Sequence, residues 1–210
     1  MSSVQSPAVD ARPAFAKVLL SSPILGPVAA LLLASIFFAV MSPRFLTGPN
    51  FSLILQQVMV VGVLAIGQTL VIITTGIDLS NGMVMALAGV LIASFAAQKG
   101  LNPWLAIVIG LLVAMAFGLL NGGLVTGVGL PAFIVTLGTM NIAYALTRIY
   151  TTSTITGLPK ELTFLGDTFT LGGTAIAWGT ILMLVLYALT WYMLKYTAAG
   201  RSVFAVGDNI

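Results

Sequence analysis

The stretch that decides the fold is residues 45–98, FLTGPNFSLILQQVMVVGVLAIGQTLVIITTGIDLSNGMVMALAGVLIASFAAQ, whose single charged side chain is Asp78. On each side of Asp78 the chain is apolar for long enough to cross a bilayer, since about 20 helical residues span its hydrocarbon core. A carboxylate between two such segments is costly unless water, backbone N–H groups or a partner satisfies it. The stretch therefore predicts two membrane helices joined by a short polar break.

The composition of the whole chain also indicates a membrane protein. Of its 210 residues, 59% are hydrophobic and 6% are charged, whereas soluble domains carry about 25% charged residues. The sequence lacks Cys and His, which excludes disulfides, thiol-ligated metals and the commonest proton shuttle. The net charge of +3 is spread along the chain, so the sequence does not suggest nucleic-acid binding.

Outside this stretch, further apolar runs predict an all-α membrane protein, a polytopic bundle of about six transmembrane helices. The first run is longer than the core of a secretory signal, so we expect a retained span. Pro131 separates the fourth and fifth spans, because proline suits a first helical turn. The runs are continuously apolar, which favours helices over barrel strands. The six predicted helices lie near residues 24–41, 51–75, 79–97, 103–126, 131–152 and 174–195.

The remaining segments are predicted to lie outside the membrane. Residues 1–22 form an N-terminal tail, residues 23–196 the membrane region, and residues 197–210 a further segment beyond the last span. Residues 153–173 carry Lys160, Glu161 and Asp167 and are expected to be an aqueous loop. Lys and Arg residues near the span ends balance between the two sides, so charge alone does not orient the chain.

The polar break around Asp78 is predicted to start the third helix. Asp78, Ser80 and Asn81 have side chains that accept hydrogen bonds from the free N–H groups of a first helical turn. An anion there also meets the positive end of the helix dipole. We expect a helix cap, and the alternatives are a cation or proton site at a broken helix and a contact with a partner or another helix.

Polar side chains recur at helical spacing on the second and fifth predicted helices. Amides, hydroxyls and an aromatic ring suit a path for a neutral polyol, and interhelical hydrogen bonding is the alternative. In the fourth helix, small residues at every fourth position (Ala114, Gly118, Gly122) predict close helix packing. The candidates for a substrate path are Gln57, Gln68, Thr75, Asn141, Tyr144 and Arg148.

The sequence offers no catalytic machinery. Its acidic residues are scattered, and it contains neither a nucleophile–base pair nor a phosphate-binding loop. We therefore expect no catalytic residue, no metal and no cofactor, and we expect any ATP to be bound by another chain.

Three blocks of the sequence resemble the permease subunits of bacterial ABC importers for ribose, xylose and related simple sugars. The blocks are GIDLSNG with MALAG (residues 76–82 and 85–89), PAFIVTLGTM (131–140) and GRSVFAVGDN (200–209), in the order and spacing of that family. The resemblance begins at about residue 45 and extends to the end of the chain. It implies ATP-driven, binding-protein-dependent import by alternating access, with the chain forming the translocation path.

The resemblance also implies site residues, partners and orientation. Gly76, Asp78 and Ser80 belong to the first block. Residues 197–210 begin a cytoplasmic segment that touches the ATPase, and Gly200, Arg201, Gly207 and Asn209 are its coupling residues. The implied partners are an ABC ATPase subunit, a periplasmic sugar-binding protein, a second permease copy (identical or paralogous) and membrane lipid. The implied location is the bacterial inner membrane, with the N-terminus and Ile210 cytoplasmic.

The chain departs from the family pattern at three places. Asn81 and Met83 replace the usual residues of the first block, and Tyr144-Ala145 stands where Arg-Gly is usual, with Arg148 one turn later. The family also continues past Ile210 through further spans, so we expect this chain to be a fragment or a truncated product.

Two other classes remain open from the residues alone. An ion-coupled secondary transporter of a small polar solute requires membrane carboxylates as relays, and only Asp78 qualifies. An intramembrane enzyme requires a reactive pair that the sequence does not show. The uncharged polar set disfavours phosphorylated or carboxylate substrates, which call for several Arg or Lys residues.

Overall fold

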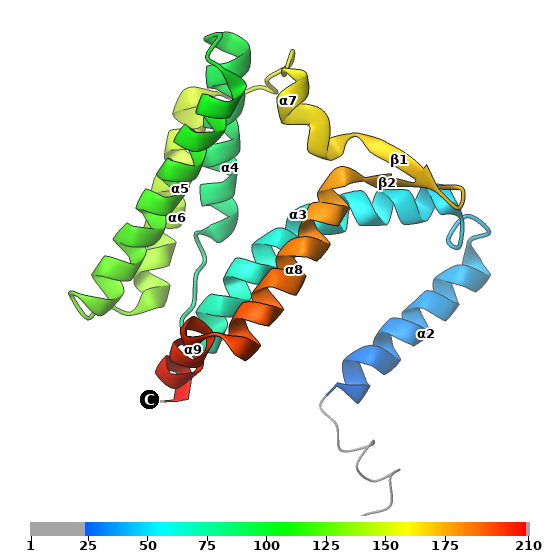
Figure 1. Cartoon of the computed structure of the whole chain (residues 1–210), viewed down its shortest axis with the longest axis horizontal. Coiled ribbons are helices and arrows are strands. Elements are labelled where there is room, and N and C mark those ends of the chain that lie inside the picture. The colour runs from blue at the N-terminus through cyan, green and yellow to red at the C-terminus, as the bar shows by residue number, and fades with distance from the viewer. Residues whose placement is uncertain (1–23, 209–210) are drawn as a thin grey trace, which may run out of the picture. The chain divides into compact units, whose positions relative to one another are not determined.

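The computed structural model describes residues 24–208 (Figure 1). The chain divides into two compact units, Met1–Phe51 and Ser52–Ile210. The predicted tail, residues 1–22, lies outside the described residues, as do Asn209 and Ile210.

In the first unit, the described residues form one apolar helix and a turn. Helix α2 spans Leu25–Met41 and buries none of its residues, as expected for a helix that faces lipid. The turn that follows is held by the Asn50 Nδ2 group, which donates to Phe45 O over 2.8 Å, and by stacking of Phe38 on Phe45. With 17 residues, α2 is about 26 Å long, so the predicted first span is shorter than the other spans.

Within residues 24–208, five helices are long and apolar enough to cross a membrane. They match five of the six predicted spans in place, and at most a third of each is buried against protein. The helices are α3 (Gly48–Ile73), α4 with its π-helical end η1 (Asn81–Gln98), α5 (Pro103–Thr126), α6 (Ala132–Tyr150) and α8 (Trp178–Tyr196). The polytopic helical fold is therefore confirmed.

Helices α4, α5 and α6 pack together, with α4 against both neighbours (Figure 1). Their shared core contains Leu87 and Leu91 of α4 and Ala143 of α6. A Cβ at Gly110 of α5 would lie 3.1 Å from Ala88 O, so α5 approaches α4 closely there. Gly118 and Gly122 have open space around them instead, and the predicted close-packing stripe was wrong at these two positions.

The segment between α6 and α8 contains more structure than the predicted loop. It holds a short helix α7 (Lys160–Thr163), a 3₁₀ turn η2 (Phe164–Gly166) and the antiparallel strands β1 (Thr168–Leu171) and β2 (Thr174–Ala177). Gly172 and Gly173 both have positive φ, 58° and 82°, the geometry of a two-residue hairpin turn. The predicted start of the last span at residue 174 was wrong, because residues 174–177 pair as β2 and α8 begins at Trp178.

An aromatic cluster fixes this hairpin to the start of α8. The Trp178 ring stacks on Phe164 and lies 4.8 Å from the centroid of Phe169. The Trp178 backbone N–H also donates to Asp167 O over 3.0 Å. The hairpin and the first turn of α8 therefore form one packed unit.

Candidate functional site

The break between α3 and α4 begins with a Schellman cap. The Gly76 N–H donates to Val71 O and the Thr75 N–H donates to Ile72 O, both over 2.9 Å, which is the paired pattern that closes a helix C-terminus. The cap places Thr75 at a φ of 59°, a left-handed conformation that glycine favours and a β-branched residue rarely adopts. Thr75 therefore lies beyond the last residue of α3, and its predicted place on a helical face with Gln57 and Gln68 was wrong.

A chain of hydrogen bonds then links the break to α5. Asp78 Oδ1 accepts from the Ser80 backbone N–H over 2.8 Å and from the Ser80 hydroxyl over 2.7 Å. Asn121 Nδ2, on α5, donates to Ser80 Oγ over 3.0 Å. Ser80 is 1% exposed and Asn121 is 8% exposed, so the hydrogen bond between them lies inside the protein.

Asp78 and Ser80 hold the turn before α4 and do not cap its first turn directly. Ser80 is the residue that precedes α4, and its side chain makes no capping hydrogen bond to that helix. The carboxylate of Asp78 instead bonds the residue two positions ahead, as an Asx turn does. The acceptor, Asp78, thus lies two residues before the N-cap position, which Ser80 occupies.

Two further hydrogen bonds tie the break to other helices. Asn81 Nδ2 donates to Leu64 O of α3 over 3.2 Å, and Thr136 Oγ1 of α6 donates to Ile77 O over 3.2 Å. With the Asn121 bond, the residues around Asp78 contact α3, α5 and α6. The polar break is therefore the place where four helices share hydrogen bonds.

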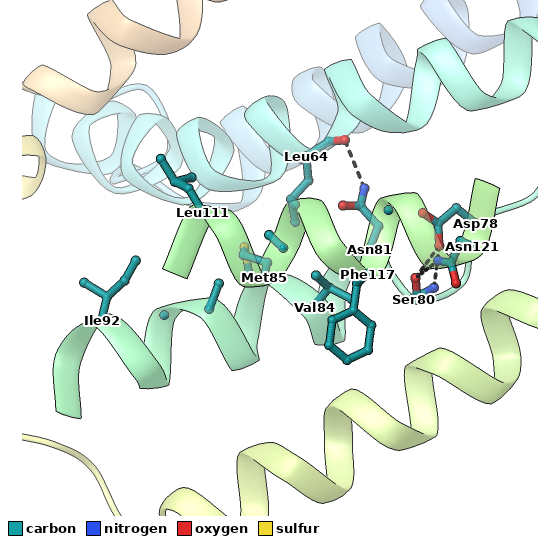
Figure 2. Close-up of a pocket in the computed structure, with 14 residues that line it drawn as sticks. Leu64, Asp78, Ser80, Asn81, Val84, Met85, Ile92, Leu111, Phe117 and Asn121 are labelled. Carbon is teal, nitrogen blue, oxygen red and sulfur yellow. Dashed lines mark hydrogen bonds between the residues drawn. The ribbon is translucent and has the colours of Figure 1, made fainter. Parts of the chain in front are cut away.

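A cavity of about 480 Å³ opens beside this break, between α3, α4 and α5 (Figure 2). One end of it is polar, with Asp78, Ser80, Asn81 and Asn121, and the rest is walled by apolar side chains such as Met85 and Phe117. Pockets of this size, mostly apolar with a few convergent polar groups, are typical of small-molecule sites. Within residues 24–208, no group of three or more Asp or Glu side chains lies together as a metal site would require.

The predicted polar faces of α3 and α6 do not converge in the described structure. Gln57 is exposed, while Gln68 is half-buried and lines a separate groove along α3. On α6, Asn141 is exposed and donates back to Leu137 O of its own helix. Tyr144 and Arg148 are exposed as well, and no hydrogen bond joins either set to the other among the described residues.

Helix α9 (Ala198–Asp208) follows α8 after a turn at Thr197. The Thr197 hydroxyl donates to Met193 O over 2.7 Å and accepts from the Gly200 N–H over 3.2 Å, so it caps the end of α8 and the start of α9. A Cβ at Gly200 would lie 2.5 Å from Met193 O, which explains a glycine there. Arg201 is exposed.

The other end of α9 contacts the end of α3. Gly207 is so close to Ile73 O that any Cβ would collide with this carbonyl oxygen. Ile73 is the last residue of α3 and lies two residues before the strained Thr75. Helix α9 therefore bridges the ends of α8 and α3, next to the polar break.

Sequence reasoning missed Asn121, Thr136 and Thr197. Asn121 sits in the small-residue stretch of α5, which we interpreted as a packing surface only. The available signal was its isolation, since polar side chains in apolar spans usually face the protein interior. The pairing of Asn121 with Ser80 lies 41 positions apart and depends on the tertiary structure.

The comparisons with known proteins agree on one class. The family model for the permease component of branched-chain amino acid transport systems matches residues 50–210. Among curated proteins, the fructose import permease protein of Rhizobium meliloti is 40% identical over 90% of this chain and 54% of its own length. The ribose import permease protein of Bacillus subtilis is 37% identical over 88% of this chain and 57% of its own length.

A third relative extends the range of names. The autoinducer 2 import system permease protein of Shigella flexneri is 33% identical over 80% of this chain and 48% of its own length. The chain thus spans about half the length of the curated relatives it matches. No solved structure matches it. With five long apolar helices among its described residues and a family match that covers residues 50–210, the chain belongs to the permease-component family of branched-chain amino acid transport systems and is a multi-pass membrane protein.

Proposed function

We propose that the chain is the permease subunit of an ATP-driven, binding-protein-dependent importer of a simple sugar. The observation that carries this proposal is the similarity to permeases named for fructose and ribose import along nearly the whole chain. The polar break supports it, because it offers several hydrogen-bonding side chains, of which Asp78 alone is ionisable, beside a cavity of suitable size. ATP hydrolysis belongs to a separate ATPase subunit, and a periplasmic binding protein delivers the sugar to a permease dimer in the inner membrane.

The bridging position of α9 supports its proposed role as the coupling segment. A force applied to α9 by an ATPase acts on Ile73 through Gly207. Ile73 directly precedes the turn that carries Asp78 and its bonded partners. Movement of α9 thereby reaches the polar break and the neighbouring cavity along residues 74–80.

Reconstitution tests the proposed function. The permease and its partner ATPase are reconstituted in proteoliposomes with the partner binding protein, and uptake of radiolabelled D-ribose and D-fructose is measured. We expect uptake that requires ATP and survives an ionophore. Uptake that proceeds without ATP and collapses with the ionophore would support the ion-coupled transporter instead.

The absence of cysteine from the sequence makes orientation easy to test. Single substitutions Thr154→Cys, at an exposed position in the segment after α6, and Ser202→Cys, on α9, each add one cysteine to this cysteine-free sequence. We propose that α9 is cytoplasmic, so a membrane-impermeant maleimide added to whole cells labels the Thr154→Cys variant and spares the Ser202→Cys variant. The opposite pattern would refute the cytoplasmic placement.

A further inference from the structure

The polar end of the α4–α5 cavity has an excess of hydrogen-bond acceptors. Ser80 donates its hydroxyl proton to Asp78, and Asn81 uses its amide nitrogen on Leu64 O. No described residue donates to Asn81 Oδ1 or to the second carboxylate oxygen of Asp78. Each amide nitrogen keeps a second N–H, but these two acceptors are unpaired, so a ligand that brings donors satisfies them.

Asn121 is a second, independent indication. Its side chain is 8% exposed and lines the cavity, and its Oδ1 is buried with no hydrogen-bond partner. An unsatisfied buried acceptor costs about 1–3 kcal/mol, and buried polar groups are nearly always paired. A donor that enters this end of the cavity offers the missing bond.

The apolar walls of the cavity limit which ligands could supply these hydrogen-bond donors. Phe117, Met85 and Val84 form an apolar surface beside the polar end (Figure 2), which suits the C–H face of a ring. A hard cation takes six or more oxygen ligands, more than these three side chains supply, and an anion is repelled by Asp78. A compact, neutral, hydroxylated ring fits both the polar end of the cavity and its apolar wall.

We propose that this cavity is a binding subsite for the transported sugar, in which Asn81, Asp78 and Asn121 accept hydrogen bonds from its hydroxyl groups and Phe117 and Met85 contact its apolar face. The proposal rests on the proposed function and adds the location of the sugar within the chain. It replaces the polar faces of α3 and α6 as the principal contact surface.

Alkylation of a cysteine in the cavity wall tests the subsite without measuring transport. The Met85→Cys variant of the permease–ATPase complex is placed in nanodiscs and reacted with a small maleimide, with and without D-ribose or D-fructose. Met115→Cys is the matched control, because Met115 is exposed on α5 outside the cavity. Proline at equal concentration controls for the solute. We expect one of the sugars to slow alkylation at least 3-fold in the Met85→Cys variant only.

Monodeoxy analogues identify the hydrogen bonds. Removal of the hydroxyl that donates to Asn121 Oδ1 should raise the half-protecting sugar concentration about 3–10-fold, the effect of one lost hydrogen bond. In the Asn121→Ala background the same analogue and its parent sugar should then protect equally. If Asn121→Ala does not assemble, the same comparison uses Asn81→Ala, whose residue is only half-buried.

The outcomes separate the subsite from the function on which it rests. Sugar transport by the reconstituted complex without protection of the Met85→Cys variant would overturn the subsite alone. If the Asn121→Ala and Asn81→Ala variants still distinguish the deoxy analogue from its parent sugar as strongly as the unsubstituted protein does, the proposed roles of Asn121 and Asn81 would be overturned. Failure of the complex to carry either sugar would overturn the proposed function and the subsite with it.

Discussion

Gly200→Ala tests whether the turn between α8 and α9 fixes α9 in place. A Cβ at this position would lie 2.5 Å from Met193 O and 2.6 Å from the carbonyl carbon of Leu194. Both atoms belong to the backbone, so they cannot rotate away, and the first turn of α9 must move. The movement also weakens the cap from Gly200 N–H to the Thr197 hydroxyl.

The magnitude follows from these two losses. Overpacking costs about 1–3 kcal/mol and loss of a cap costs about 1 kcal/mol, while alanine gains about 1 kcal/mol over glycine in a helix. The net destabilisation of the docked α9 is then about 1–3 kcal/mol, using the same values. This raises the population of undocked α9 about 5–150-fold.

Tryptic cleavage after Arg201 measures that population, because proteolysis follows local opening. We expect the detergent-solubilised Gly200→Ala variant to be cleaved there at least 5-fold faster than the parent, with fragments assigned by mass spectrometry. Gly67→Ala is the matched control, since nothing lies within 4 Å of a Cβ at Gly67 on α3. Equal cleavage rates in the Gly200→Ala and Gly67→Ala variants would refute the steric argument.

Four further substitutions probe the break and the helix ends. Thr75→Gly should raise the thermal unfolding midpoint in detergent, since it relieves a left-handed threonine at a gain of about 0.5–1 kcal/mol; a lower midpoint would contradict the strain. Asn102→Ala should destabilise the protein by about 1 kcal/mol, because Asn102 Oδ1 accepts from the first turn of α5, and an unchanged midpoint would rule this cap out. Asp78→Asn should keep normal assembly and allow uptake, since an amide oxygen still accepts from Ser80, but the half-saturating sugar concentration should rise about 3–10-fold because the amide nitrogen replaces the second acceptor oxygen; complete loss of uptake with normal assembly would favour an ionic role. Arg201→Glu in the full-length importer should abolish stimulation of the ATPase and leave membrane insertion intact; normal transport would remove the reason to assign coupling to this segment.

The spans could be predicted because long apolar runs have few alternatives in a membrane. A run such as that of α5 must satisfy its backbone internally, so its helix follows from composition alone. The residues at which the helices begin and end were harder to predict. Thr75 continues the helical spacing of α3, yet Gly76 allows a Schellman cap that removes Thr75 from the helix. Likewise, Gly172-Gly173 turns residues 174–177 into a strand that apolarity alone assigned to a helix.

The sequence predicted the site residues that are close together in the chain but missed the one that comes from a distant helix. Asp78 and Ser80 stand out in the sequence because they interrupt an apolar stretch, and their mutual hydrogen bonds are local. Asn121 contributes through a contact between α5 and the break, which no periodicity reveals. The polar faces of α3 and α6 illustrate the reverse case, since residues that share a helical face need not meet a common partner.

Thr197 forms the elbow between α8 and α9. Its hydroxyl donates to Met193 O, which also accepts from the Thr197 N–H, and it accepts from the Gly200 N–H, so separating the two helices leaves the Gly200 N–H without this partner. At its opposite end α8 is clamped to the β1–β2 hairpin by Trp178. Helix α8 has 19 residues and is about 28 Å long, so a tilt of about 10° imposed at the elbow swings the hairpin by about 5 Å. A tilt of α8 would therefore be transmitted from Thr197 at one end of the helix to the hairpin at the other.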